Sequence, residues 1–171
     1  MAPPLLFVLF SHWGEAENRA LLFGLGGALF CIGVLIRVWA QMHLHYRLPV
    51  KKILTRTGPY QFTRNPFYIA NTIILLGLSV VSGLIWCLPV MLVYCAIVYS
   101  FVVRYEESHL RNKYGAPYEE YLATVPRWVP DLSLQENQHT PHVLQYLWSS
   151  VKTELHNLLF ILPFLAKQLL S

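Results

Sequence analysis

The stretch NPFYIANTIILLGLSVVSGLIWCLPVMLVYCAIVYSFVV, residues 65–103, decides the fold of this chain. It contains no charged side chain, and a Ser-Gly pair at 82–83 provides a turn signal between two apolar runs. A helix needs about 20 apolar residues to cross a bilayer. The stretch therefore predicts a membrane hairpin with spans at 65–81 and 84–103. Pro66 suits a first helical turn, whereas Pro89 predicts a kink in the second span.

Upstream of the hairpin, Ala20–Met42 predicts another span of similar length. We expect Arg37 to extend toward lipid headgroups and Trp39 to lie at the interface. Small residues also lie close together on one predicted face, which would let another helix approach. These small residues are Gly24, Gly27, Ala28 and Gly33.

The composition agrees with an all-α integral membrane protein that has at least three transmembrane helices. Charged residues make up 13% of the 171 residues, against about 25% in soluble domains. We expect a single domain over 1–171, with its core at 20–130, a linker at 131–141 and an interfacial or half-inserted helix within 142–171. The net charge is +4, and the basic residues cluster beside the apolar spans. This favours a lipid bilayer over nucleic acid as the partner.

The basic residues also predict the orientation of the chain. Residues 43–65 hold five lysines and arginines and no acidic residue, and further basic residues follow the last span, while the hairpin tip has none. The positive-inside rule places both polar segments in the cytoplasm. The N-terminus lacks a basic region before its short apolar run, so we expect no cleaved signal peptide.

These two polar segments carry the candidate site. In the first, Gly58-Pro59 and Arg64-Asn65-Pro66 are turn signals, and the helix that starts at Pro66 would offer free N–H groups to an anionic group. Tyr60 and Tyr68 can stack on a flat ring. The second segment supplies Glu106 and Glu107, and we expect Glu107 to pair with Arg104 and Arg111 at helical spacing. Together they suit a zwitterionic ligand that carries a nucleoside.

The pattern GPY…RNPFY, an apolar hairpin and then EESHL…KYGAPYEEYLATVPRWVP resembles the isoprenylcysteine carboxyl methyltransferases and the related phospholipid methyltransferases. The resemblance implies an enzyme that transfers a methyl group from S-adenosylmethionine to a lipophilic acceptor, with S-adenosylhomocysteine as product. The acceptor would be a prenylcysteine carboxylate or a phospholipid amine. It implies catalytic roles for Glu106 and Arg104 and a cytoplasmic-face cofactor pocket made of His45, Lys52, Ile53, Leu54, Thr55, Tyr60, Asn65, Pro66, Phe67, Tyr68, Glu106 and Glu107.

The chain departs from the pattern of that family at three positions. Asn65 replaces the usual histidine, which keeps a hydrogen-bonding group but removes a titratable one. Lys52 stands where histidine is frequent. Val102 stands where the prenylcysteine enzymes have an arginine that faces the substrate carboxyl, and Arg104 is the nearest basic residue. The last difference weakens the prediction of a prenylcysteine substrate.

Two alternatives share parts of the pattern. Membrane sterol reductases have a similar C-terminal region and bind NADPH, but the pair Glu106-Glu107 favours the methyltransferases. A non-catalytic membrane scaffold would explain the aromatic and basic belts without any chemistry. A metal site is not expected, because His43 and His45 form a pair without an evident third ligand.

Overall fold

The chain folds into helices only, over the part that the structure describes. The computed structural model describes residues 19–47, 53–133, 143–159 and 162. Its elements are α2 (Arg19–Arg47), α3 (Pro59–Phe62), α4 (Pro66–Val81), α5 (Cys87–Tyr114), α6 (Ala116–Thr124), the 3-10 helix η1 (Val143–Tyr146) and α7 (Leu147–Leu159). The predicted all-α class is confirmed. The expectations for the N-terminal 18 residues and for most of the linker at 131–141 lie outside the described residues.

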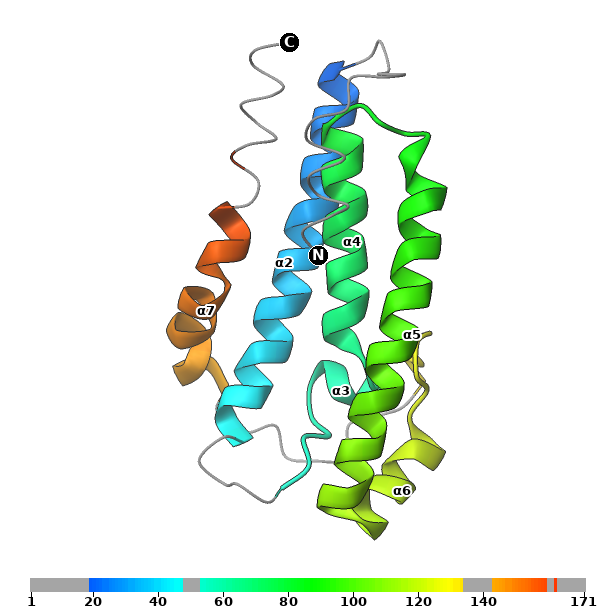
Figure 1. Cartoon of the computed structure of the whole chain (residues 1–171). Coiled ribbons are helices and arrows are strands. Elements are labelled where there is room, and N and C mark those ends of the chain that lie inside the picture. Colours follow the sequence, from blue (N-terminus) through cyan, green and yellow to red (C-terminus); the bar gives the residue numbers. More distant parts are fainter. Residues whose placement is uncertain (1–18, 48–52, 134–142, 160–161, 163–171) are drawn as a thin grey trace.

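Three long helices form the body of the molecule (Figure 1). Two of them are long and apolar enough to cross a membrane, over Ala20–Leu44 and Cys87–Tyr114. The helix between them, α4, has 16 residues and a length of about 24 Å, somewhat less than the ~30 Å of a bilayer core. The structure therefore gives two candidate spans where the sequence predicts at least three, although α4 packs with both of them as the predicted hairpin requires.

The connection between α4 and α5 is short, as predicted, but Pro89 does not kink a helix. Gly83 in the connection has a φ of 75°, which a residue with a side chain rarely adopts. Helix α5 begins at Cys87 rather than at 84, so Pro89 lies in its first turn. The backbone N–H groups of a first turn have no partner within the helix, and proline costs little there.

Helices α2 and α4 approach closely because glycine lies where their backbones meet. A Cβ on Gly26 would lie 2.7 Å from the Gly77 carbonyl oxygen, and a Cβ on Gly33 would lie 2.9 Å from the Ala70 carbonyl oxygen. Gly33 was expected on a contact face, but Gly24 and Gly27 have no neighbour within 4 Å of a built Cβ. The prediction was wrong for these two, because the contact face follows 26, 30 and 33 along the helix.

Helix α7 runs along α2 (Figure 1) and is fixed to it by an ion pair. Arg37 Nε lies 2.7 Å from a carboxylate oxygen of Glu154, whose side chain is 2% exposed. The expectation that Arg37 extends to lipid headgroups was therefore wrong. The buried partner, instead of water or headgroups, compensates the charge of Arg37. Helix α7 begins at Leu147 and runs along the bundle, while most of the segment after it, on which an interfacial or half-inserted helix was predicted, lies outside the described residues.

We expect Gly26→Ala and Gly33→Ala to destabilise the protein, because each added methyl group meets backbone atoms of α4 at less than 3.0 Å. Gly27→Ala is the matched control. It has open space and should be neutral or stabilising by up to about 1 kcal/mol through helix propensity. Thermal unfolding in detergent, followed by circular dichroism, measures the difference. Equal midpoints for the three variants would contradict the close contact of the two backbones.

Candidate functional site

The polar segments gather at one end of the helix bundle and enclose a pocket. Helix α3, the start of α4, the end of α5 and α6 lie at this end (Figure 1). The pocket has a volume of about 410 Å³, within the range of roughly 300–1,000 Å³ that small-molecule sites occupy. Its walls are formed by Leu44, Leu54, Thr55, Tyr60, Arg64, Asn65, Pro66, Phe67, Tyr68, Asn71, Glu106, Glu107, Leu110, Tyr114, Tyr118 and Tyr121.

One wall of the pocket contains Leu54, Thr55 and Tyr60, and it depends on a turn at Gly58, which has a φ of 62°. A Cβ on this glycine would lie 2.4 Å from the buried ring of His43, so the turn requires glycine for its backbone and for its space. Nδ1 of the His43 ring lies 2.9 Å from the Thr57 hydroxyl.

Among the residues that the structure describes, no group of three or more His, Cys, Asp or Glu side chains is suited to hold a metal ion.

A segment without regular secondary structure, residues 125–131, lies along the connection between α3 and α4. The Arg64 N–H donates to the Pro126 carbonyl at 2.9 Å, and the Asp131 N–H donates to the Phe62 carbonyl at 2.9 Å. The side-chain amide of Asn65 donates to the Arg127 carbonyl at 3.0 Å. These bonds fix the loop before α4, and the Asn65 amide keeps its carbonyl oxygen and a second N–H that it can offer to a ligand.

The two adjacent glutamates have different surroundings. Glu107 is 6% exposed and accepts hydrogen bonds from two arginines. Arg127 binds both of its oxygens, at 3.0 and 2.6 Å, and Arg64 binds one at 3.1 Å. The bond to Glu107 is the main reason that the pKa of Arg127 is raised. The expected pairing of Glu107 with Arg104 and Arg111 is not found. Its actual partners, Arg64 and Arg127, lie in loops that only the fold brings near to α5.

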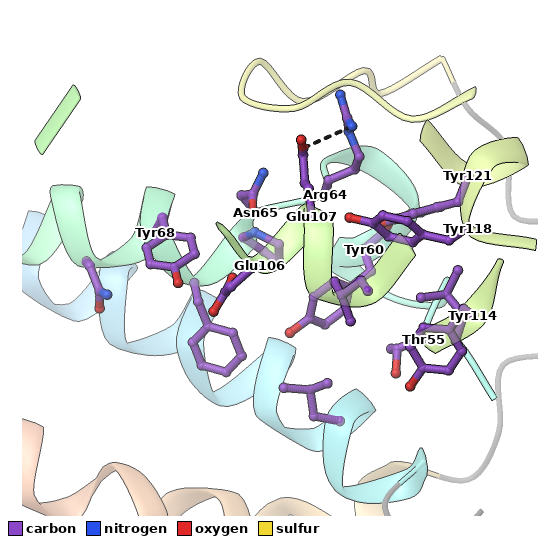
Figure 2. A pocket seen from close by; sticks show the side chains of 16 residues that line it. Thr55, Tyr60, Arg64, Asn65, Tyr68, Glu106, Glu107, Tyr114, Tyr118 and Tyr121 are labelled. Carbon is purple, nitrogen blue, oxygen red and sulfur yellow. Dashed lines mark hydrogen bonds and ion pairs between the residues drawn. The ribbon is translucent and has the colours of Figure 1, made fainter. Parts of the chain in front are cut away.

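Glu106 is exposed and lies on the Tyr68 side of the pocket, whereas Glu107 lies on the Arg64 side (Figure 2). The Tyr68 hydroxyl is its hydrogen-bonding neighbour. Among the described residues, no arginine or lysine forms an ion pair with Glu106. Glu106 therefore provides a negative charge that no described cation pairs with, in a pocket lined by six aromatic side chains, and this favours a cationic or hydrogen-bond-donating ligand.

Three tyrosines, Tyr60, Tyr118 and Tyr121, line another part of the pocket. Burial raises the pKa of Tyr118 to about 12 and raises the pKa of Tyr60 and of Tyr121 well above the ordinary value for tyrosine. A tyrosine hydroxyl is protonated at physiological pH even at its ordinary pKa, so all three can donate a hydrogen bond. The hydroxyl of Tyr121 donates to the Tyr60 carbonyl at 2.6 Å, which joins α6 to α3.

The pocket brings together most of the residues predicted for the cofactor. Nine of them line it: Leu54, Thr55, Tyr60, Asn65, Pro66, Phe67, Tyr68, Glu106 and Glu107. Ile53 is 45% exposed and does not line it. The side chain of His45 and the whole of Lys52 lie outside the described residues.

Arg104, predicted as catalytic, is exposed and is not among the lining residues. It precedes Glu106 by two positions on α5. Two positions correspond to about 200° around a helix, so its side chain faces away from the pocket. The structure thus does not bring Arg104 and Glu106 together in the pocket, and a catalytic role for Arg104 stays a prediction.

Several lining residues were not predicted from the sequence. They are Leu44, Arg64, Asn71, Leu110, Tyr114, Tyr118 and Tyr121. Helical spacing offered a signal for two of them, since Asn71 follows Phe67 by four positions and Leu110 follows Glu106 by four. Arg127, the second partner of Glu107, had no such signal, because it is twenty residues away along the chain.

Comparison with known proteins agrees with the resemblance seen in the sequence. Two relatives are the nickel-cobalt-cadmium resistance protein NccN of Alcaligenes xylosoxydans xylosoxydans and the cobalt-zinc-cadmium resistance protein CzcN of Cupriavidus metallidurans. They are 26% and 28% identical over 76% and 80% of this chain. The chain spans about three fifths of their length, 60% and 62%. No solved structure matches the chain.

The match to a protein family covers the pocket as well as the long helices. The model of the phospholipid methyltransferase family matches residues 21–117, which include α2, α3, α4 and α5 almost completely. The matched region contains Glu106, Glu107 and the turn before α4. Since the match covers more than half of the 171 residues, this chain, a membrane protein with two apolar helices long enough to span a bilayer, belongs to the phospholipid methyltransferase family.

Proposed function

We propose that this protein transfers a methyl group from S-adenosylmethionine to a lipophilic acceptor at the edge of the membrane. The observation that supports the proposal best is the position of Glu106. No described lysine or arginine forms an ion pair with this carboxylate, which lies beside aromatic side chains at the point where a long apolar helix becomes polar. A cationic, nucleoside-bearing ligand can reach such a pocket from water, and an apolar acceptor can reach it from the bilayer.

The residues of the pocket fit the groups of S-adenosylmethionine. Its amine and ribose hydroxyls can donate to the Glu106 carboxylate, and its adenine can stack on Tyr60 or Phe67. Its carboxylate suits the N-terminal end of α4, which carries a partial positive charge. His45, Lys52 and Ile53 remain candidates for the rim of the same site.

When bound, S-adenosylmethionine supplies a methyl group on a positively charged sulfur, which is open to attack by a nucleophile. The protein contributes mainly by holding the acceptor in line with that methyl group. A carboxylate acceptor is already nucleophilic at neutral pH. An amine acceptor must lose a proton, and Glu106 is the carboxylate placed to take it.

We further propose that α2, α4 and α5 all cross the membrane and that the pocket opens to the cytoplasm. The excess of lysine and arginine beside the pocket supports this orientation. The shorter α4 is compatible with a span because it packs against both α2 and α5. The bilayer can also become thinner around a helix that is shorter than its hydrocarbon core. The acceptor would then enter between helices from the cytoplasmic leaflet.

Isothermal titration of the detergent-purified protein with S-adenosylhomocysteine tests the proposed cofactor. We expect saturable binding, with no heat from NADPH titrated in parallel. Binding of NADPH alone would contradict the proposal and favour a reductase. The acceptor can then be sought by following the labelled methyl group of S-adenosylmethionine into phosphatidylethanolamine vesicles and into total lipid extracts.

We expect Glu106→Gln to weaken the binding of S-adenosylhomocysteine by at least about tenfold, since a hydrogen bond to a charged group contributes roughly 1.5–3 kcal/mol. The thermal midpoint should not change, because Glu106 is exposed and forms no ion pair among the described residues. Glu120→Gln is the control: it removes an exposed carboxylate of α6 that does not line the pocket. Undiminished binding by the Glu106 variant would remove this residue from the site.

Glu107→Gln should act on stability instead. It leaves Arg64 and Arg127 without their shared anion, and we expect a loss on the order of 1–3 kcal/mol in the free energy of unfolding. Denaturation in detergent, compared between the Glu106 and Glu107 variants, measures this. A smaller loss for Glu107→Gln than for Glu106→Gln would show that the two adjacent carboxylates had been assigned the wrong way round.

A further inference from the structure

The proposed function makes no use of Arg37, although its side chain donates three hydrogen bonds inside the helix bundle. Its guanidinium donates to both oxygens of Glu154 on α7, at 2.7 and 3.1 Å. A third nitrogen, Nη1, donates to the side-chain oxygen of Asn71 on α4. The guanidinium carbon also lies 5.1 Å from the centre of the Phe67 ring. One side chain of α2 therefore connects α4 and α7.

Two of these contacts reach the pocket. Phe67 and Asn71 both line it, and they are four positions apart, so they lie on the same face of α4. Arg37 itself does not line the pocket. It contacts the outer side of the wall that these two residues form.

The contact with Arg37 also determines how the Asn71 amide is presented. A guanidinium only donates, so it selects the carbonyl oxygen of the amide as its partner. With the oxygen turned toward Arg37, the NH₂ group, which has two hydrogens, is the donor that Asn71 can present to the pocket. Asn71 is 8% exposed, and a buried donor discriminates strongly between ligands that accept a hydrogen bond and ligands that do not.

A tether between helices alone would not require charge. Two ions removed from water cost several kcal/mol each, and apolar residues of similar size often replace a buried ion pair without loss of stability. The pair Arg37–Glu154 is largely buried, with side-chain exposures of 16% and 2%. Glu154 also lies outside the matched family region, so α7 supplies the anion for an arginine of the family core.

We infer that Arg37 is a positioning residue. Held by Glu154, it orients Asn71 so that the amide donates a hydrogen bond to an oxygen or ring nitrogen of the bound cofactor, and it supports the Phe67 ring beside it. The inference rests on the proposed function, because the cofactor is the ligand that Asn71 would contact. It makes α7, which contributes no residue to the pocket wall, necessary for full affinity.

Two variants separate positioning from simple tethering, with S-adenosylhomocysteine as the probe. The double variant Arg37→Leu/Glu154→Leu removes both charges together and should keep a thermal midpoint close to that of the wild type. Asn71→Asp keeps an oxygen for Arg37 but has no NH₂ group. We expect both variants to bind about tenfold more weakly than the wild type, the change expected for one lost hydrogen bond.

The control is a second ion pair between two elements, Arg111→Leu/Glu119→Leu. It joins α5 to α6, has half-exposed side chains and does not line the pocket, so affinity should be unchanged. A stable Arg37/Glu154 double variant that binds S-adenosylhomocysteine within about twofold of the wild type would overturn the inference and leave the proposed function intact. If that variant fails to fold, unchanged affinity of Asn71→Asp would overturn it equally. A wild-type protein that does not bind S-adenosylhomocysteine would overturn both.

Discussion

The backbone contact between α2 and α4 is the constraint on which the rest of the structure depends. Glycines 26, 33 and 77 allow the two helices to approach until a single added methyl group would collide with backbone atoms. In a lipid environment, helices gain little from hiding apolar surface from each other, so close packing of this kind is a main source of their association. The contact fixes where Arg37, His43, Phe67 and Asn71 stand relative to one another.

At the polar end of the bundle, ion pairs hold the segments together. Glu107 joins the start of α4 to the segment after α6 through Arg64 and Arg127, and His43 supports the turn at Gly58. Both devices hold the loop before α4, which forms one wall of the pocket. Glu106 is left free of ion pairs among the described residues. Of the two neighbouring carboxylates, Glu107 thus stabilises the fold, and Glu106 is the one proposed to bind the ligand.

A good part of this arrangement could be predicted from particular residues. Long uncharged runs imply helices in a membrane, Gly58-Pro59 and Asn65-Pro66 imply turns, and Glu106 so close to an apolar run implies a site. The errors for Arg37 and Glu107 share one cause, which is that the true partner is distant in sequence. Glu154 lies 117 residues from Arg37, and Arg127 lies twenty residues after Glu107 and outside any helix, so no helical spacing indicates either pair.

The sequence by itself determined the helical class, the order of the apolar segments and nine of the residues that line the pocket, because these depend on local composition and on motifs within short segments. Only the tertiary structure decided which face of α2 packs on α4, which glutamate is neutralised and that α7 reaches the outer side of the pocket wall. Rotation about a helix axis and the choice of a charge's partner depend on contacts between distant segments. No local pattern in a chain encodes them.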